Sequence, residues 1–114
     1  MANYNQNTKI KGALRQIARY MPNREIALER ARDWQNHGVR GGAMYFCAKH
    51  KQKKSFLRKD IQVDHIDPVE PIDRKVTDWN EHIKRLFCEV SNLQVLCKPC
   101  HLIKSIEENA NRTY

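Results

Sequence analysis

The chain has 114 residues, 40% of them hydrophobic and 30% charged, which suits one soluble globular domain and excludes general disorder. No apolar run approaches the roughly 20 residues that a membrane-spanning helix needs. The formal net charge of +8 is uneven, because residues 1–60 carry 14 Lys/Arg against 4 Asp/Glu, whereas residues 61–114 carry 7 against 9. A basic front half beside a mildly acidic back half favours a polyanion partner next to a cation-binding site.

Two helices are predicted near the start of the chain. The first covers residues 8–21, where apolar residues recur at helical spacing: Ile10, Leu14, Ile17 and Ala18. The second lies within residues 21–38, with Pro22 in its first turn and Gly38 just past its end. Its apolar stripe is expected to consist of Ile26, Ala27, Ala31 and Trp34.

The rest of the chain mixes strands and helices, so the predicted fold class is α+β. In chain order we expect a flexible connector over residues 38–42 and a hairpin or knuckle over 43–63. A short helix over 77–89, a strand over 92–97 and a closing helix over 98–111 follow. Asp78 and Glu81 are spaced as an N-terminal capping pair for the short helix. Its inward-facing residues are expected to be Trp79, Ile83, Leu86 and Phe87.

Cysteine and histidine spacing predicts a structural zinc site. The segment "CAKH" supplies Cys47 and His50, and "CKPC" supplies Cys97 and Cys100. A two-residue gap lets two ligands from one tight turn face the same ion, and two such turns complete a closed tetrahedral shell. Cys88 is the alternative to His50 as fourth ligand, although its place on the apolar side of a helix favours a core thiol.

A second candidate site includes the pair Asp64–His65, in "IQVDHIDPVE". His101 directly follows the last predicted zinc ligand, so a bound metal would fix its direction. We therefore expect Asp64, His65 and His101 to meet on a strand–strand–helix unit. Asp67 and Glu70 are interpreted as solvated turn residues beside two prolines.

The segments "VDHIDPV" and "SNLQVLCKPCHLIKS" together resemble the HNH endonuclease family, whose ββα-metal motif is named for its His, Asn and His. The matching positions are His65, Asn92 and His101, with Asp64 as the acidic neighbour. The likeness covers residues 43–106, and the basic helical extension of residues 1–40 is similar to the front of small phage-encoded HNH proteins. His50 stands where that family usually has cysteine.

The resemblance implies a single nuclease domain over residues 1–114, with a zinc-stapled ββα-metal core, that hydrolyses DNA phosphodiester bonds to 3′-hydroxyl and 5′-phosphate ends. It implies that His65 activates water, that Asp64 and His101 hold Mg²⁺ or Mn²⁺ (or Ni²⁺), and that Asn92 bonds backbone near His65.

Basic residues around this motif are candidate phosphate contacts. The predicted DNA-binding set is Arg15, Arg19, Lys53, Lys54 and Lys104, with Lys51, Arg58 and Lys59 as further members of the basic stretch before Asp64. Other candidates receive plainer interpretations: His37 and His82 as surface or capping residues, and Trp34 and Trp79 as core residues.

Two alternative functions share many of these residues. A non-catalytic zinc-ribbon-like nucleic-acid-binding module would need the zinc and the basic face, but not Asp64, His65 or Asn92. A nuclease subunit could also act only inside a larger DNA-processing assembly, directed by a partner protein. The start of the chain shows no secretory signal, so we expect a cytoplasmic protein (in the host, if phage-encoded) with no membrane partner.

Overall fold

The computed structural model describes residues 5–114, and the first four residues of the predicted amino-terminal extension lie outside this range. The α+β class is confirmed: the described chain holds four helices and two small antiparallel sheets. The helices are α1 (Gln6–Ala18), α2 (Pro22–Arg30), α3 (Trp79–Leu86) and α4 (Lys98–Asn111). The strands are β1 (Arg32–Asp33), β2 (Met44–Phe46), β3 (Ser55–Leu57), β4 (Ile61–His65) and β5 (Leu93–Cys97).

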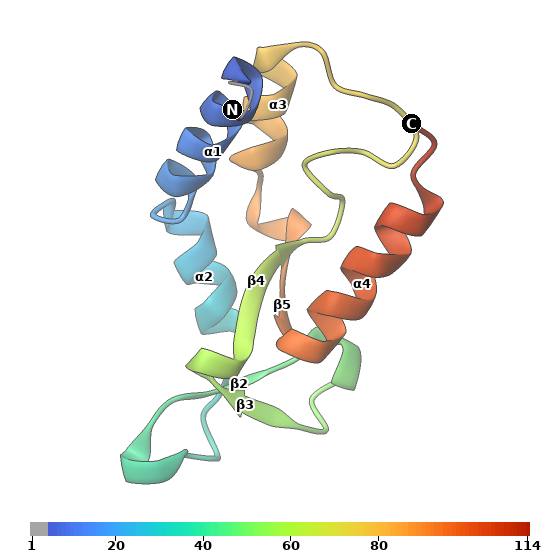
Figure 1. Cartoon of the computed structure of the whole chain (residues 1–114). Helices are drawn as coiled ribbons and strands as arrows, with labels where there is room; N and C mark the ends of the chain where they lie inside the picture. Colours follow the sequence, from blue (N-terminus) through green and yellow to red (C-terminus); the bar gives the residue numbers. More distant parts are fainter. Residues whose placement is uncertain (1–4) are drawn as a thin grey trace, which may run out of the picture.

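The strands β4 and β5 form the centre of the molecule, with α2 on one side and α4 on the other (Figure 1). They pair antiparallel in a register that sets Asp64 opposite Gln94 and His65 opposite Leu93. Alternation along β4 turns Ile61 and Val63 toward α2, because successive strand residues face opposite sides. The main core consists of Met21, Ala27, Leu28, Ile61, Val63, Leu93 and Val95.

The second sheet has the order β1-β2-β3 and lies below the β4–β5 pair in Figure 1. Its β2–β3 hairpin confirms the predicted hairpin over residues 43–63, although the last residues of that range belong to β4. A small buried cluster of Cys47, Leu96 and Cys97 connects this sheet to β5, with Phe56 of β3 packed against it.

Helix α2 ends at Arg30, so the prediction that it continues to Gly38 is wrong. The buried Asp33 side chain accepts hydrogen bonds from the Gln35 amide and the Asn36 side chain, which stabilises a turn, and β1 pairs with β2 instead. The side chain of Trp34 is consequently 64% exposed, under the Arg32 guanidinium, rather than part of the core.

Helix α3 begins as predicted, with Asp78 accepting a hydrogen bond from the Asn80 amide. Glu81 does not complete a capping pair, because it forms an ion pair with Arg74. His82 is only 5% exposed and packs edge-on against Trp79, so its interpretation as a surface or capping residue is wrong. Ile83 was expected inside but is exposed.

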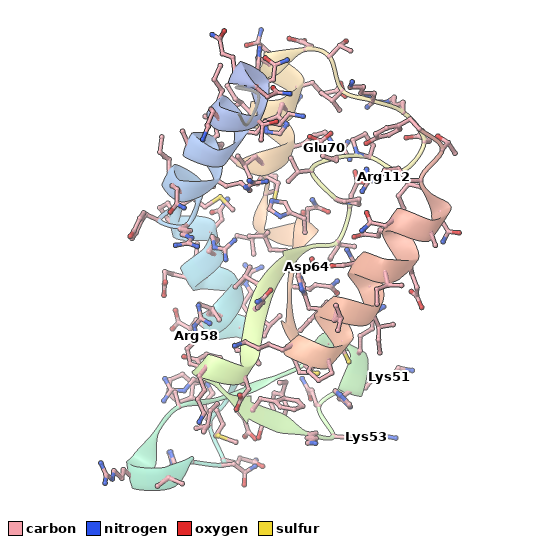
Figure 2. All side chains as sticks on the ribbon, viewed as in Figure 1. Lys51, Lys53, Arg58, Asp64, Glu70 and Arg112 are labelled. Atoms are coloured by element: carbon pink, nitrogen blue, oxygen red, sulfur yellow. The ribbon has the colours of Figure 1, made fainter. Side chains whose placement is uncertain are left out.

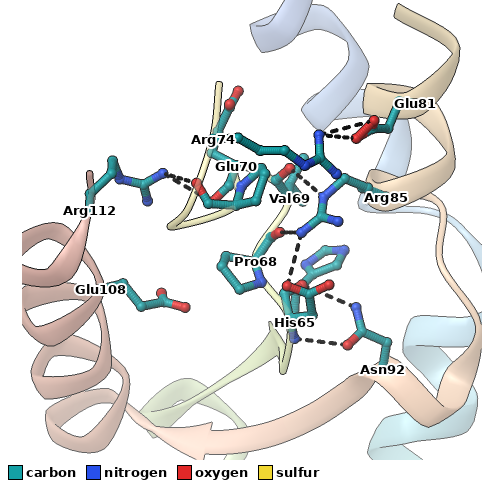
Figure 3. A network of polar contacts seen from close by, with 12 residues as sticks. His65, Pro68, Val69, Glu70, Arg74, Glu81, Arg85, Asn92, Glu108 and Arg112 are labelled. Carbon is teal, nitrogen blue, oxygen red and sulfur yellow. Dashed lines mark hydrogen bonds and ion pairs between the residues drawn. The ribbon is translucent and has the colours of Figure 1, made fainter. Parts of the chain in front are cut away.

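The segment between β4 and α3 is held by arginines rather than by regular structure (Figure 3). Arg85 of α3 donates to the carbonyls of Pro68 and Val69 and pairs with Asp67. Glu70 pairs with Lys11 of α1 at 2.7 Å, so it is not merely a solvated turn residue. These contacts fasten the chain that follows His65 to both α1 and α3.

Among residues 5–114, no helix combines the length and the apolar character that crossing a membrane would require.

Candidate metal and catalytic site

Four side chains from two sheets and one helix converge below α4. Cys47 follows β2 and begins a short 3-10 turn that carries His50. Cys97 ends β5, and Cys100 lies in the first turn of α4. Lys51 and Gln52 adopt left-handed backbone angles, with φ of 48° and 64°, which turn the chain back into β3. We call Cys47, His50, Cys97 and Cys100 the cysteine centre.

The geometry of the cysteine centre fits a tetrahedral zinc ion. Its four donor atoms all lie within 4.8 Å of one another, and no other such group of three or more His, Cys, Asp or Glu residues exists among residues 5–114. The Nε2 atom of His50 is 3.6 Å from the Sγ atoms of both Cys97 and Cys100. Standard zinc–sulfur and zinc–nitrogen bonds at a tetrahedral angle place sulfur and nitrogen about 3.6 Å apart. These four residues could therefore bind zinc.

Hydrogen bonding and burial act differently on the thiols of this centre. Burial opposes ionisation of Cys47, but backbone amides of Cys97 and Lys49 lower its pKa overall. Hydrogen bonding with Cys97, followed by burial, raises the pKa of Cys100 to about 12. A divalent cation would relieve this conflict, because metal-bound thiols are deprotonated.

The fourth residue of the cysteine centre is His50 rather than Cys88. Cys88 lies outside the cysteine centre and packs against the main core, as its predicted role of core thiol requires. Burial raises the pKa of its thiol. The ring of His50 instead packs on Phe56, with centroids 5.6 Å apart, which orients the imidazole toward Cys97 and Cys100.

A second group lies between β4 and α4, and we call Asp64, His101, Lys104 and Glu108 the Asp64 centre. The Oδ1 atom of Asp64 is 3.5 Å from Nε2 of His101, so the predicted meeting of these two residues is observed. The Lys104 ammonium lies 3.1 Å from Asp64 Oδ2 and 2.9 Å from Glu108 Oε2, and donates to the backbone carbonyl of His65. Carboxylates and a carbonyl thus surround a cation at this position.

Lys104 holds its charge within the protein. Burial lowers its pKa, but hydrogen bonds to Glu108 and Asp64 raise it overall, so the ammonium stays protonated at neutral pH. Its side chain is only 15% exposed. The sequence predicted a phosphate contact here, whereas in the structure both neighbouring carboxylates bind this ammonium.

The ring of His65 does not join the Asp64 centre, which corrects the expected meeting of Asp64, His65 and His101. Consecutive strand residues face opposite sides, and His65 turns away from α4 toward the end of α3. Its Nε2 atom is 2.9 Å from the Leu86 carbonyl oxygen. A carbonyl can only accept, so Nε2 carries the proton and Nδ1 of the neutral ring keeps its lone pair.

Asn92 organises the turn that follows His65 (Figure 3). Its side chain accepts from the Asp67 amide at 2.8 Å and donates to the Asp67 carbonyl. Its own carbonyl accepts from the Ile66 amide, which extends the β4–β5 pairing by one step. Asn92 therefore bonds backbone near His65, as the family resemblance implied.

The predicted DNA-binding residues separate into different environments. Arg15 and Arg19 line one cavity together with His65. Lys53 and Lys54 are exposed near the cysteine centre, where the ammonium of Lys54 lies over the Phe56 ring.

Comparison of the chain with protein-family models, with curated proteins and with solved structures found no match. The function of the two centres therefore has to follow from their own residues and geometry. One centre is a complete cysteine–histidine donor set, and the other is a partial, oxygen-rich set.

Sequence reasoning missed three residues of this region. Glu108 lies one helical turn after Lys104, a spacing that could have indicated a shared partner. Arg85 and Arg24 gave no such signal, because their contacts depend on segments distant in sequence. Arg24 of α2 lines the His65 cavity beside Arg15 and Arg19.

Proposed function

We propose that this chain is a metal-dependent endonuclease of the HNH type, which hydrolyses DNA phosphodiester bonds to 3′-hydroxyl and 5′-phosphate ends. Its ββα-metal unit would be β4, β5 and α4, stapled by zinc at the cysteine centre. The observation that carries the proposal is the end of β4. Asp64 meets His101 on one face of the strand, and the His65 imidazole is held on the other.

The placement of His65 and Asp64 on opposite faces of β4 suits phosphodiester hydrolysis. In-line displacement at phosphorus puts the attacking water and the departing 3′ oxygen on opposite sides of the phosphate. A phosphodiester at the end of β4 would have the imidazole on one side and the Asp64 centre on the other. Separation of His65 from Asp64 therefore supports cleavage better than a single crowded cluster would.

His65 is suited to be the general base. Its Nε2–H donates to the Leu86 carbonyl, so Nδ1 is left to accept the proton of the attacking water. The same carbonyl stabilises the imidazolium that forms, because a carbonyl oxygen attracts positive charge. Asn92 acts as a positioning residue, since it fixes the turn after His65 through both polar atoms of its amide.

The Asp64 centre has the donors for a hard divalent ion such as Mg²⁺ or Mn²⁺. Asp64 and His101 would hold it, while Glu108 contacts the Lys104 ammonium that also contacts Asp64. When bound, such an ion supplies charge neutralisation at the phosphate and at the leaving oxygen. The Lys104 ammonium already occupies this position beside Asp64, and it would compete with the ion for Asp64.

Zinc would serve structure rather than chemistry. Four protein ligands close the shell and leave no position for water or substrate. Cys100 directly precedes His101, so a metal at the cysteine centre fixes the start of α4 and the direction of the His101 side chain.

One observation favours the rival function of a non-catalytic zinc-ribbon-like nucleic-acid-binding module. The Lys104 ammonium satisfies Asp64 without any metal ion, at 3.1 Å. A purely structural role for Asp64 would need no more than this ion pair. The same test separates the two functions and also detects a nuclease that depends on a partner protein.

The test is cleavage of supercoiled plasmid by zinc-loaded protein with Mg²⁺ or Mn²⁺. The wild type and His37→Ala, a change at an exposed histidine, should convert the plasmid to open-circle or linear DNA, whereas His65→Ala should not. Equal cleavage by His65→Ala would remove His65 as the base. DNA binding without cleavage by the wild type would favour the binding module, or a nuclease that needs its partner.

A further inference from the structure

Among residues 5–114, the outer edge of β4 pairs with no other strand, because β4 and β5 form a two-stranded sheet. Two adjacent cavities lie along that edge, of about 400 and 290 Å³. The first is lined by Ile61, Gln62 and Val63 of β4, and the second by His65, while β5 contributes to neither. Arg19 and Arg24 line both cavities, so the two adjoin, and we treat them together as one depression.

The walls of this depression are strongly basic. We define the β4-edge groove by its six cationic residues, which come from α1, α2, the turn before β4 and the start of α4: Arg15, Arg19, Arg24, Arg58, Lys59 and Lys98. No aspartate or glutamate lines either cavity. The groove reaches the His65 imidazole at its far end.

These charges are uncompensated, unlike others in the described chain. Lys11, Arg74, Arg85 and Lys104 each form an ion pair with a carboxylate, whereas none of the groove cations does so among residues 5–114. Arg24 shows the cost: burial lowers its pKa, and the charges of Arg58 and Arg19 lower it further. A fold that gathers like charges without counter-ions is matched to a polyanion.

We propose that the β4-edge groove holds the phosphate backbone of one DNA strand and leads it to His65. This inference rests on the proposed nuclease function and specifies where its substrate lies. The five residues of β4 span about 16 Å, long enough for several consecutive phosphates. Four of the six cations are arginines, whose planar guanidinium groups match phosphate oxygens.

The groove assigns DNA contact to a different surface from the lysine-rich turn. Figure 2 shows Lys51 and Lys53 on the side of the molecule away from Arg58. The run of basic residues from Lys51 to Lys59 is therefore divided by β3, and only its last part borders the groove. This division supplies a matched pair of variants.

The test compares two double variants that each remove two positive charges. Arg19→Ala with Lys59→Ala changes exposed residues of the groove, and Lys53→Ala with Lys54→Ala changes exposed residues of the lysine-rich turn. Binding of a fluorescently labelled DNA duplex is measured by anisotropy over a range of salt, with zinc-loaded protein and no added Mg²⁺. Thermal melting of both variants checks that they remain folded.

The groove variant should lose about tenfold or more in affinity, and its salt dependence should fall by about two units of log–log slope. The lysine-rich-turn variant should stay close to wild type. Equal losses of DNA affinity in the two variants, or a larger loss in the lysine-rich-turn variant, would refute DNA binding at the groove. So would a wild type that binds an acidic peptide such as poly-glutamate along this edge in preference to DNA.

Failure of the groove is distinguishable from failure of the nuclease. If the groove variant loses DNA binding but the wild type never cuts DNA, the role of the groove in binding is supported and the proposed nuclease activity is refuted. If the wild type cuts DNA and the groove variant binds and cuts DNA as well as the wild type does, the nuclease activity is supported and the proposed role of the groove is refuted.

Discussion

The cysteine centre and the Asp64 centre lie at the two ends of the same small unit, yet they are built differently. The cysteine centre has four donors at mutual distances that fit tetrahedral zinc, and Cys47 and Cys97 are almost fully buried. In the Asp64 centre, the candidate metal ligands Asp64 and His101 lie 3.5 Å apart, His101 is about one-third exposed, and the Lys104 ammonium contacts Asp64. The first is complete and closed, and the second is partial and open.

Under the proposed function, this difference lets one helix serve both structure and chemistry. A closed shell contributes free energy to folding because no ligand position is left for solvent. An open centre contributes little to folding but leaves positions for a phosphate. Cys100 and His101 are neighbours on α4, so the rigid centre positions the open one.

The largest expected effect is the loss of zinc and of folding stability when one residue of the cysteine centre is replaced. Cys97→Ser should reduce bound zinc from one equivalent to nearly none and abolish a cooperative unfolding transition, because zinc binding of about 10 kcal/mol or more exceeds the stability of many small domains. Zinc analysis and thermal unfolding measure this. Cys88→Ser is the control and should retain zinc; an unchanged melting curve for Cys97→Ser would refute the structural role.

The next effect is on catalysis. His65→Ala should lower the cleavage rate by about 10² to 10⁴, the usual worth of a general base, while DNA affinity stays within a few-fold of wild type. Imidazole added to the buffer should restore part of the rate, since it can accept the same proton. If the variant loses DNA binding instead, or imidazole rescues nothing, His65 acts through structure.

A smaller effect is expected at the Asp64 centre. Lys104→Met removes the ammonium that competes for Asp64, so the Mg²⁺ concentration giving half-maximal cleavage should fall several-fold. Lys84→Met, at an exposed position of α3, is the matched control. An unchanged Mg²⁺ dependence, with a lower maximal rate, would show that Lys104 contacts phosphate rather than opposing the ion.

The smallest effect concerns acid stability. Burial lowers the pKa of His82, although Glu70 acts in the opposite direction, so the folded chain keeps this ring neutral. In the unfolded chain the ring binds a proton near pH 6.5, and stability should therefore fall as pH drops below that value. His82→Phe should flatten this decline in urea unfolding between about pH 7 and 5; parallel curves for both proteins would contradict it.

Much of this arrangement could be predicted from the sequence. The cysteine centre, β5 and α4 follow from local spacing, because metal ligands and strand–helix junctions leave short-range signals. The meeting of Asp64 with His101 follows from the expected strand–strand–helix unit. The separation of Asp64 from His65 was also within reach, since strand alternation alone puts neighbours on opposite faces.

The parts that could not be predicted depend on distant contacts. Helix α2 ends early because β1 pairs with β2, a contact that helical periodicity does not report. His82 is buried by Trp79 and by the approach of α1 to α3. The β4-edge groove assembles cations from four separate segments, and only the tertiary fold shows that Arg24 belongs with Arg58.

The central claim is that the two centres do different work, one structural and one catalytic. The most direct measurement takes zinc-loaded protein freed of other divalent ions and follows plasmid nicking and melting temperature together as Mg²⁺ is added. The account predicts no nicking without Mg²⁺, saturable nicking with it, and a nearly constant melting temperature throughout. Nicking at full rate by the zinc-loaded protein alone, or no nicking at any Mg²⁺ or Mn²⁺ concentration while DNA remains bound, would contradict it.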